Sequence, residues 1–130
     1  MRLQFPENYS KPLLRIALSF VFLYFGYQQI TEPVAWTGFV PSHVLLFGIT
    51  AYQVVIINAL LELSFGLLLL IGLYTRFVSF ILALHLFGIA FSLGFNDLGV
   101  RDFGLACATL AVFLQGSDRW CLDEKWKKSE

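Results

Sequence analysis

Long apolar runs dominate the chain, and short polar stretches with proline, glycine or charged residues separate them. A helix needs about 20 apolar residues to cross the roughly 30 Å hydrocarbon core of a bilayer. The pattern therefore predicts an all-α fold, a transmembrane four-helix bundle in a single membrane domain. The expected spans cover residues 13–30, 51–73, 77–95 and 101–115, followed by a polar tail over residues 116–130.

One apolar run, from His43 to Leu73, is too long for a single span. About thirty helical residues would extend roughly 45 Å, well beyond the hydrocarbon core. Gly48 and Thr50 are residues that typically end and begin helices, so we place a break between them. Residues 43–49 are then predicted to form a short interfacial helix or re-entrant piece before the second span.

The composition agrees with a membrane protein, because 58% of the residues are hydrophobic and only 14% are charged. Nine basic and nine acidic residues cancel, and no basic patch is interleaved with aromatic residues. This argues against nucleic acid as a partner. The lipid bilayer is the partner that the composition predicts.

The basic residues predict the orientation of the chain. In a four-span topology, Arg101 falls on one side, and the other eight fall on the opposite side: Arg2, Lys11, Arg15, Arg76, Arg119, Lys125, Lys127 and Lys128. Loops rich in Lys and Arg stay on the cytoplasmic side. We therefore expect a multi-pass protein of the cell (plasma) membrane with both termini cytoplasmic.

Each predicted span carries one stripe of small or polar residues at helical spacing, and such stripes are expected to face the other helices. The stripes are Arg15, Ser19, Phe22, Gly26 and Gln29 in the first span, Asn58, Glu62 and Gly66 in the second, His85, Gly88 and Ser92 in the third, and Arg101, Gly104, Ala108, Ala111 and Gln115 in the fourth. The Leu, Ile, Val and remaining Phe side chains are expected to face lipid.

Glu62 and His85 lie at the middle of the second and third spans. A carboxylate at that depth costs at least about 2.5 kcal/mol in lipid, so it should point into protein. Because consecutive spans run in opposite directions, the two side chains are expected at the same depth and are predicted to pair. The pair either fixes helix register or is catalytic, exchanging protons. With Asn58, it forms a candidate binding site for a quinone headgroup, a ligand that needs hydrogen-bond donors in an apolar groove.

A second group of polar residues is expected to meet at the outer end of the bundle and is a candidate substrate-binding cap: Gln28, Gln29, Asn96, Asp97, Arg101 and Asp102. Trp36 and His43 are expected close to it. Arg15 lies near the inner end of the first span, and we expect its side chain to extend to the cytoplasmic surface.

Cofactor motifs are not evident in the sequence. Cys107 and Cys121 form no Cys-x-x-Cys pair, and their spacing predicts neither a disulfide nor a metal site. The sequence also has no haem-attachment motif, no cysteine cluster for iron and sulfur, and no dinucleotide fingerprint. A membrane quinone is therefore the one cofactor that we consider.

An ordered set of short motifs resembles the DoxX family of small four-span membrane proteins. The motifs are Leu14-Arg15 and Gly26, the stretch from Trp36 to Pro41, Glu62, the stretch from Gly66 to Arg76, His85-Leu86, the stretch from Gly94 to Asp102, and the stretch from Trp120 to Asp123. The resemblance implies a subunit or accessory of a quinone-linked membrane oxidoreductase of the thiosulfate:quinone type, working with a redox partner subunit.

A non-enzymatic membrane scaffold is the alternative, either a homo-oligomer or a docking partner for another membrane protein. Small-residue stripes of the kind described above would serve helix association in such a scaffold. The sequence leaves open whether the chain itself catalyses a reaction.

Overall fold

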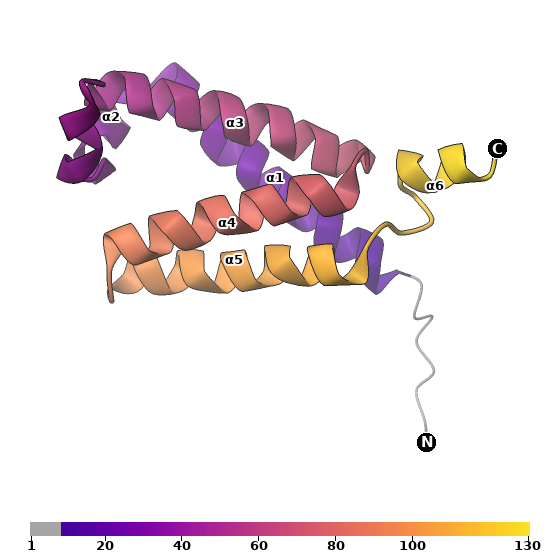
Figure 1. Ribbon diagram of the computed structural model, residues 1–130. Helices are drawn as coiled ribbons and strands as arrows, with labels where there is room; N and C mark the ends of the chain where they lie inside the picture. The colour runs from indigo at the N-terminus through magenta and orange to yellow at the C-terminus, as the bar shows by residue number, and fades with distance from the viewer. Residues whose placement is uncertain (1–8) are drawn as a thin grey trace.

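Four long helices form most of the computed structural model, which describes residues 9–130 (Figure 1). They are α1 (Ser10–Thr31), α3 (Ala51–Ile71), α4 (Thr75–Leu93) and α5 (Asp97–Gln115). The shorter elements are the helices α2 (Pro33–Trp36) and α6 (Leu122–Lys127) and the 3-10 helices η1 (Thr37–Phe39) and η2 (Ser42–Phe47). Residues 9–130 contain no strand, so the predicted all-α fold is confirmed.

Three of these helices are long and apolar enough to cross a membrane, namely α1, α3 and α4. Helix α5 is not among them, and Asp97, Arg101 and Asp102 lie within its first two turns. It nevertheless has 19 residues and packs along α4 (Figure 1). Three helices thus have the length and composition of membrane spans, and the fourth span stays a prediction.

The predicted break before the second span is confirmed. Helix η2 ends at Gly48, whose φ of 78° lies in the left-handed region that glycine tolerates. Thr50 then caps α3: its Oγ1 accepts the backbone N–H of Gln53 at 3.2 Å, and Gln53 Oε1 accepts the backbone N–H of Thr50 at 3.1 Å. This capping box fixes the start of α3. The short piece predicted before the second span corresponds to η2, and its interfacial or re-entrant position stays a prediction.

Helix α5 begins four residues earlier than predicted. Asn96 Oδ1 accepts the backbone N–H of Gly99 at 2.9 Å, an arrangement that starts a helix. Residues 97–100, which lie between the third and fourth predicted spans, therefore form the first turn of α5. Elsewhere the observed helix ends differ from the predicted spans by no more than three residues.

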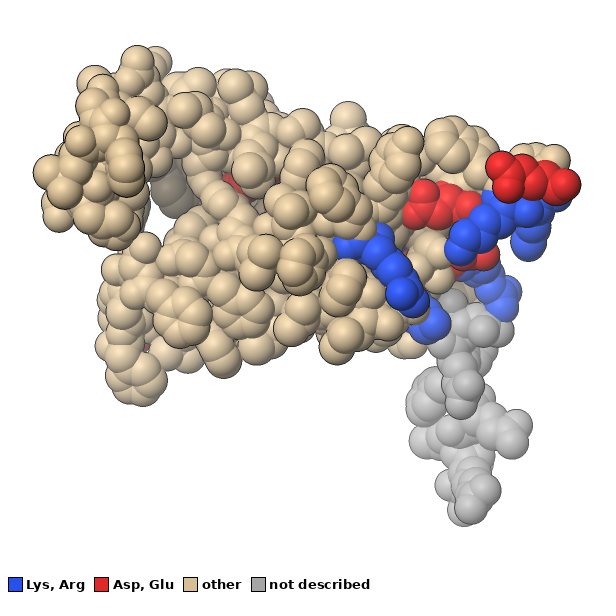
Figure 2. Space-filling model, viewed as in Figure 1, with Lys and Arg blue, Asp and Glu red and all other residues tan. Residues whose placement is uncertain are grey.

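The bundle is closed at one end and open at the other. Helices α3 and α4 meet at their connecting turn and separate toward the opposite end, while α1 packs mainly against α3 and α4 mainly against α5 (Figure 1). We call the end with the α3–α4 turn and α6 the basic end, because Lys and Arg side chains gather there (Figure 2). The open end comprises α2, η1, η2 and the α4–α5 turn.

The stripes predicted for the first two spans are confirmed. All five stripe residues of α1 are buried, as are Glu62 and Gly66 of α3, and Asn58 is half-buried. Helix α3 approaches α1 closely at Gly66, because this residue has no side chain. A Cβ there would lie 3.1 Å from Phe22 Cβ. Small residues thus bring α1 and α3 together, as expected for helices in lipid.

The stripes predicted for the last two spans are wrong in part. Gly88 and Ser92 of α4 and Arg101, Gly104 and Gln115 of α5 are exposed. The buried faces instead consist of Thr75, Val78, Ser79, Leu82, Ala83, Leu86 and Ala90 in α4 and of Gly99, Asp102, Ala106, Thr109 and Val112 in α5. Helix α4 packs through mostly apolar side chains, which a search for polar stripes does not find. The buried face of α5 is a second stripe of small and polar residues beside the predicted one.

Two glycines with the same left-handed backbone conformation differ in their surroundings. Comparing them tests how the C-terminal segment packs against α3 at the basic end. Gly72 has φ of 76°, and a Cβ there would lie 2.6 Å from three atoms of Cys121. Gly48 has φ of 78° and nothing within 4 Å of that position.

We expect Gly48→Ala to cost only the roughly 1–2 kcal/mol of a left-handed alanine. Gly72→Ala should cost clearly more, because Cys121 must also move. Thermal unfolding of both variants in detergent measures the difference. Equal losses of stability would contradict the packing of residue 121 against the end of α3.

Candidate functional site

A cavity of about 670 Å³ occupies the space between the separated helices. This volume lies within the range of small-molecule sites, about 300–1,000 Å³. Figure 2 shows the molecule hollowed at the open end. Polar residues from several elements line the cavity: Gln29, His43, Asn58, Glu62, His85, Ser92, Arg101 and Asp102. Most of the remaining wall is aliphatic or aromatic, with Phe22, Phe25, Trp36 and Phe39.

Glu62 points into this cavity and not into lipid, as predicted, and is only 4% exposed. Its Oε2 accepts a hydrogen bond from Gln29 Nε2 at 3.1 Å, and its Oε1 accepts one from Asn58 Nδ2 at 3.2 Å. Asn58 Nδ2 also donates to Gln29 Oε1 at 2.6 Å. Both oxygens of Glu62 therefore act as acceptors, and both donors are neutral side-chain amides.

His85 lies beside Glu62, so the predicted proximity of the two side chains is confirmed. Its Nε2 atom is 3.4 Å from Glu62 Oε1. The geometry does not make this contact a hydrogen bond, and Nε2 is buried without any hydrogen-bond partner among residues 9–130. A buried imidazole nitrogen without a partner is costly. The arrangement favours a ligand that bonds to Nε2 in the cavity.

Arg101 and Asp102 form a second polar group on the cavity wall. Arg101 Nε and NH2 both donate to Asp102 Oδ1 at 3.1 Å, and Asp102 is 7% exposed. The Arg101 guanidinium also lies over the ring of Phe25, with 5.4 Å from Cζ to the centroid. The pair is locally neutral and connects α5 with α1 at the open end.

The predicted outer cap is only partly assembled around the cavity. Gln29, Arg101 and Asp102 line it, together with Trp36 and His43, which were expected nearby. Three further members do not line it: Gln28, Asn96 and Asp97. Asn96 serves as the cap of α5, and Asp97 is exposed in the first turn of that helix. A role for the cap in substrate binding stays a prediction.

Sequence reasoning missed one aromatic wall of the cavity. We expected the phenylalanines of the first span outside its stripe to face lipid, whereas Phe25 lines the cavity and packs edge-on against Trp36 at 5.8 Å. Its position one residue before Gly26 of the stripe was the signal that could have found it.

A family model described as DoxX matches residues 11–94. The chain belongs to the DoxX family. No curated protein and no solved structure matches the chain significantly. The DoxX match covers α1 to α4 and thus includes Gln29, Asn58, Glu62 and His85. Arg101 and Asp102 lie outside the matched residues.

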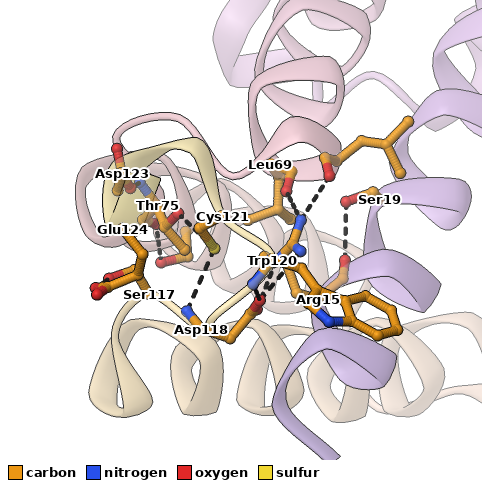
Figure 3. A network of polar contacts seen from close by, with 12 residues as sticks. Arg15, Ser19, Leu69, Thr75, Ser117, Asp118, Trp120, Cys121, Asp123 and Glu124 are labelled. Atoms are coloured by element: carbon orange, nitrogen blue, oxygen red, sulfur yellow. Dashed lines mark hydrogen bonds and ion pairs between the residues drawn. The ribbon is translucent and has the colours of Figure 1, made fainter. Parts of the chain in front are cut away.

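This DoxX protein has a second buried polar cluster at its basic end (Figure 3). Arg15 donates from Nε to Asp118 Oδ2 at 2.7 Å, and from NH1 to the carbonyl oxygens of Leu69 and Leu70 at 2.8 and 2.5 Å. We predicted that Arg15 extends to the surface, and this is wrong, because the residue is only 2% exposed. Its partner Asp118 lies in the segment that we expected to be a polar tail.

The segment that follows α5 also caps the first residues of α4 (Figure 3). Asp123 accepts the backbone N–H groups of Tyr74 and Thr75, both at 2.8 Å, so it caps a helix 48 residues away in the chain. Cys121 is buried, and its Sγ accepts hydrogen bonds from Thr75 Oγ1 at 3.5 Å and from the Asp118 N–H at 3.3 Å. Burial raises the pKa of the Cys121 thiol. Both cysteines are free, as expected from their spacing.

The Arg15–Asp118 pair predicts how stability depends on pH. Burial alone would raise the pKa of Asp118, but the hydrogen bonds from Arg15 and Trp120 and the charge of Arg15 outweigh it and hold the pKa below 3.8. A carboxyl whose pKa is lowered by folding stabilises the protein above its unfolded pKa and loses this contribution as the pH falls through the folded pKa.

We therefore expect the stability difference between the wild type and Asp118→Asn to be constant above about pH 5 and to shrink below about pH 4. Thermal unfolding in an acid-stable detergent over this range measures the difference. A difference that stays constant down to about pH 3 would contradict this role of Asp118.

Proposed function

We propose that this DoxX protein is an accessory subunit of a quinone-linked membrane oxidoreductase of the thiosulfate:quinone type, and that its cavity binds the quinone headgroup. One observation carries the proposal: an apolar cavity beside the midpoints of α3 and α4 ends on a buried carboxylate and on an imidazole nitrogen that has no hydrogen-bond partner within residues 9–130. A quinone carbonyl needs a hydrogen-bond donor in apolar surroundings, and His85 Nε2–H offers one.

The polar residues beside the proposed quinone position have two roles, proton transfer and positioning of the carboxylate. When a quinone takes up two electrons, its oxygens take up two protons, and the Glu62–His85 pair lies where it can pass protons to one oxygen. Gln29 and Asn58 hold the Glu62 carboxylate in place. We assign the supply of electrons to a partner subunit, because the sequence carries no motif for a haem or a dinucleotide.

We further propose that the protein lies in the plasma membrane with both termini cytoplasmic. Lys and Arg side chains gather at the basic end, where Arg15, Arg76 and α6 lie (Figure 2). Arg101 is at the open end instead. Arg2, which entered the charge count of the sequence, falls outside the described residues. By the positive-inside rule, the basic end faces the cytoplasm, and the cavity is reached from the outer half of the membrane.

Fluorescence quenching tests whether the cavity binds quinone, because Trp36 lines it and the other two tryptophans do not. The Trp120→Phe, Trp126→Phe protein in nanodiscs leaves Trp36 as the sole reporter. We expect saturable quenching by a short-chain ubiquinone analogue.

Two glycine substitutions separate binding from partitioning into lipid. Gly88 lines the cavity and Gly104 does not, and both have open space around the Cβ position. Gly88→Phe should weaken saturable quenching by about tenfold or more, because the new ring occupies the cavity, whereas Gly104→Phe should not. Equal, unsaturable quenching in both variants would contradict the proposal and favour the non-enzymatic scaffold.

A further inference from the structure

The cavity contains a buried carboxylate, Glu62, and the proposed quinone site does not explain what balances its charge. Arg101 and Asp102 neutralise each other at 3.1 Å. Glu62 receives hydrogen bonds only from neutral amides, and no Lys or Arg is within ion-pair distance of it among residues 9–130. A carboxylate buried this deeply requires a positive charge close by.

The groups that face Glu62 show where that positive charge can reside. Helix α1 contributes the amide of Gln29, α3 that of Asn58, and α4 the imidazole of His85. The Arg101–Asp102 pair of α5 and the imidazole of His43 in η2 complete the titratable and charged groups on the cavity wall. The counter-charge is therefore either a proton on the Glu62–His85 pair or a cation that enters the cavity.

The walls of the cavity fit an organic cation with aromatic or apolar bulk. The rings of Phe22, Phe25, Trp36 and Phe39 line the space that leads to Glu62. Aromatic faces attract cations, and more strongly where water is excluded. A cation with hydrophobic substituents would bury them against these rings and place its charge near the carboxylate.

The geometry points to a binding site for hydrophobic monovalent organic cations, in which the bound cation replaces one proton of the Glu62–His85 pair. The exchange balances in charge, because one cation enters and one proton leaves to solvent. This site would serve ligands other than quinones, and it does not depend on the proposed redox function.

Binding of tetraphenylphosphonium to the full chain in nanodiscs tests the inference by titration calorimetry. We expect saturable binding with release of one proton per cation, seen as a dependence of the heat on the buffer used. In the pH range where the pair carries its proton, the affinity should fall by about tenfold for each unit of decreasing pH. Triphenylphosphine oxide, which has similar aromatic bulk and no net charge, should bind without this pH dependence.

Four substitutions make the test specific to the cavity. Glu62→Gln should weaken binding of the phosphonium by about tenfold or more, and Glu62→Asp, which keeps the charge, should restore most of it. Gly88→Phe should block binding, whereas Gly104→Phe should leave it unchanged.

If Glu62→Gln fails to fold, the comparison of Gly88→Phe with Gly104→Phe and the pH dependence of wild-type binding still test the inference. Binding that is independent of pH, or equally tight for the neutral oxide, would overturn the inference. The quinone proposal would then be tested by the Trp36 quenching measurement alone.

Discussion

Replacing Asp118 by alanine is expected to lower the free energy of unfolding by about 3–5 kcal/mol. The change leaves the Arg15 guanidinium buried at the basic end without its carboxylate, and such an uncompensated charge is among the most costly defects in a folded protein. It also removes the tie between α1 and the segment that follows α5. The carbonyl oxygens of Leu69 and Leu70 would remain as partners of Arg15 but carry no full charge.

Chemical unfolding in mixed detergent micelles measures this effect. Glu124→Ala is the matched control, because Glu124 lies in the same C-terminal segment but pairs at the surface with Ser117 and Lys127. Surface pairs of this kind contribute little to the free energy of unfolding. Replacing both members of the buried pair, Arg15→Met with Asp118→Leu, should recover part of the loss, since no charge is then left buried. If Asp118→Ala were no more harmful than Glu124→Ala, the proposed tie would be wrong.

The second large effect is expected at Glu62. Glu62→Gln keeps the size of the side chain but cannot accept a proton, so we expect quinone-dependent turnover of the assembled oxidoreductase to fall by about 100-fold or more. Quinone binding, measured through Trp36, should change far less. His85→Leu should reduce both turnover and binding, because it removes the donor that faces the ligand.

Redox difference spectroscopy of membranes with thiosulfate and added quinone follows quinone reduction and gives the turnover, and Glu32→Gln is the control. Glu32 is an exposed carboxylate that lies outside the cavity lining. Turnover that is equal in Glu62→Gln, His85→Leu and Glu32→Gln, with all three proteins folded, would exclude a role in proton transfer. The Glu62–His85 pair would then be a structural device that fixes the register of α3 and α4.

The sequence predicted well those features that follow from spacing along one helix or one hairpin. Glu62 and His85 meet because consecutive helices joined by a short turn place their midpoints at the same depth. The inward face of α1 was equally predictable, because its small and polar residues recur every three or four positions. The break at Gly48 and Thr50 followed from residue types that act locally.

Hydrophobicity alone could not identify the buried faces of α4 and α5. In lipid, side chains that face the bilayer are as apolar as those that face another helix, so the pattern does not distinguish them. Gly88 and Gly104 are small but open, whereas the helices pack through residues such as Leu82 and Ala106. Only the position of the neighbouring helix decides which face is covered.

The amino-acid sequence by itself determined that this is a helical membrane protein, where its helices break, and that a carboxylate and an imidazole meet at mid-depth. Tertiary structure alone decided that the helices separate at one end to leave a cavity, and that Asp118 neutralises an arginine 103 positions away. The physical reason is the range of the interactions. Helix formation and hairpin depth depend on neighbours in the chain, whereas a cavity and a long-range ion pair depend on how whole helices pack.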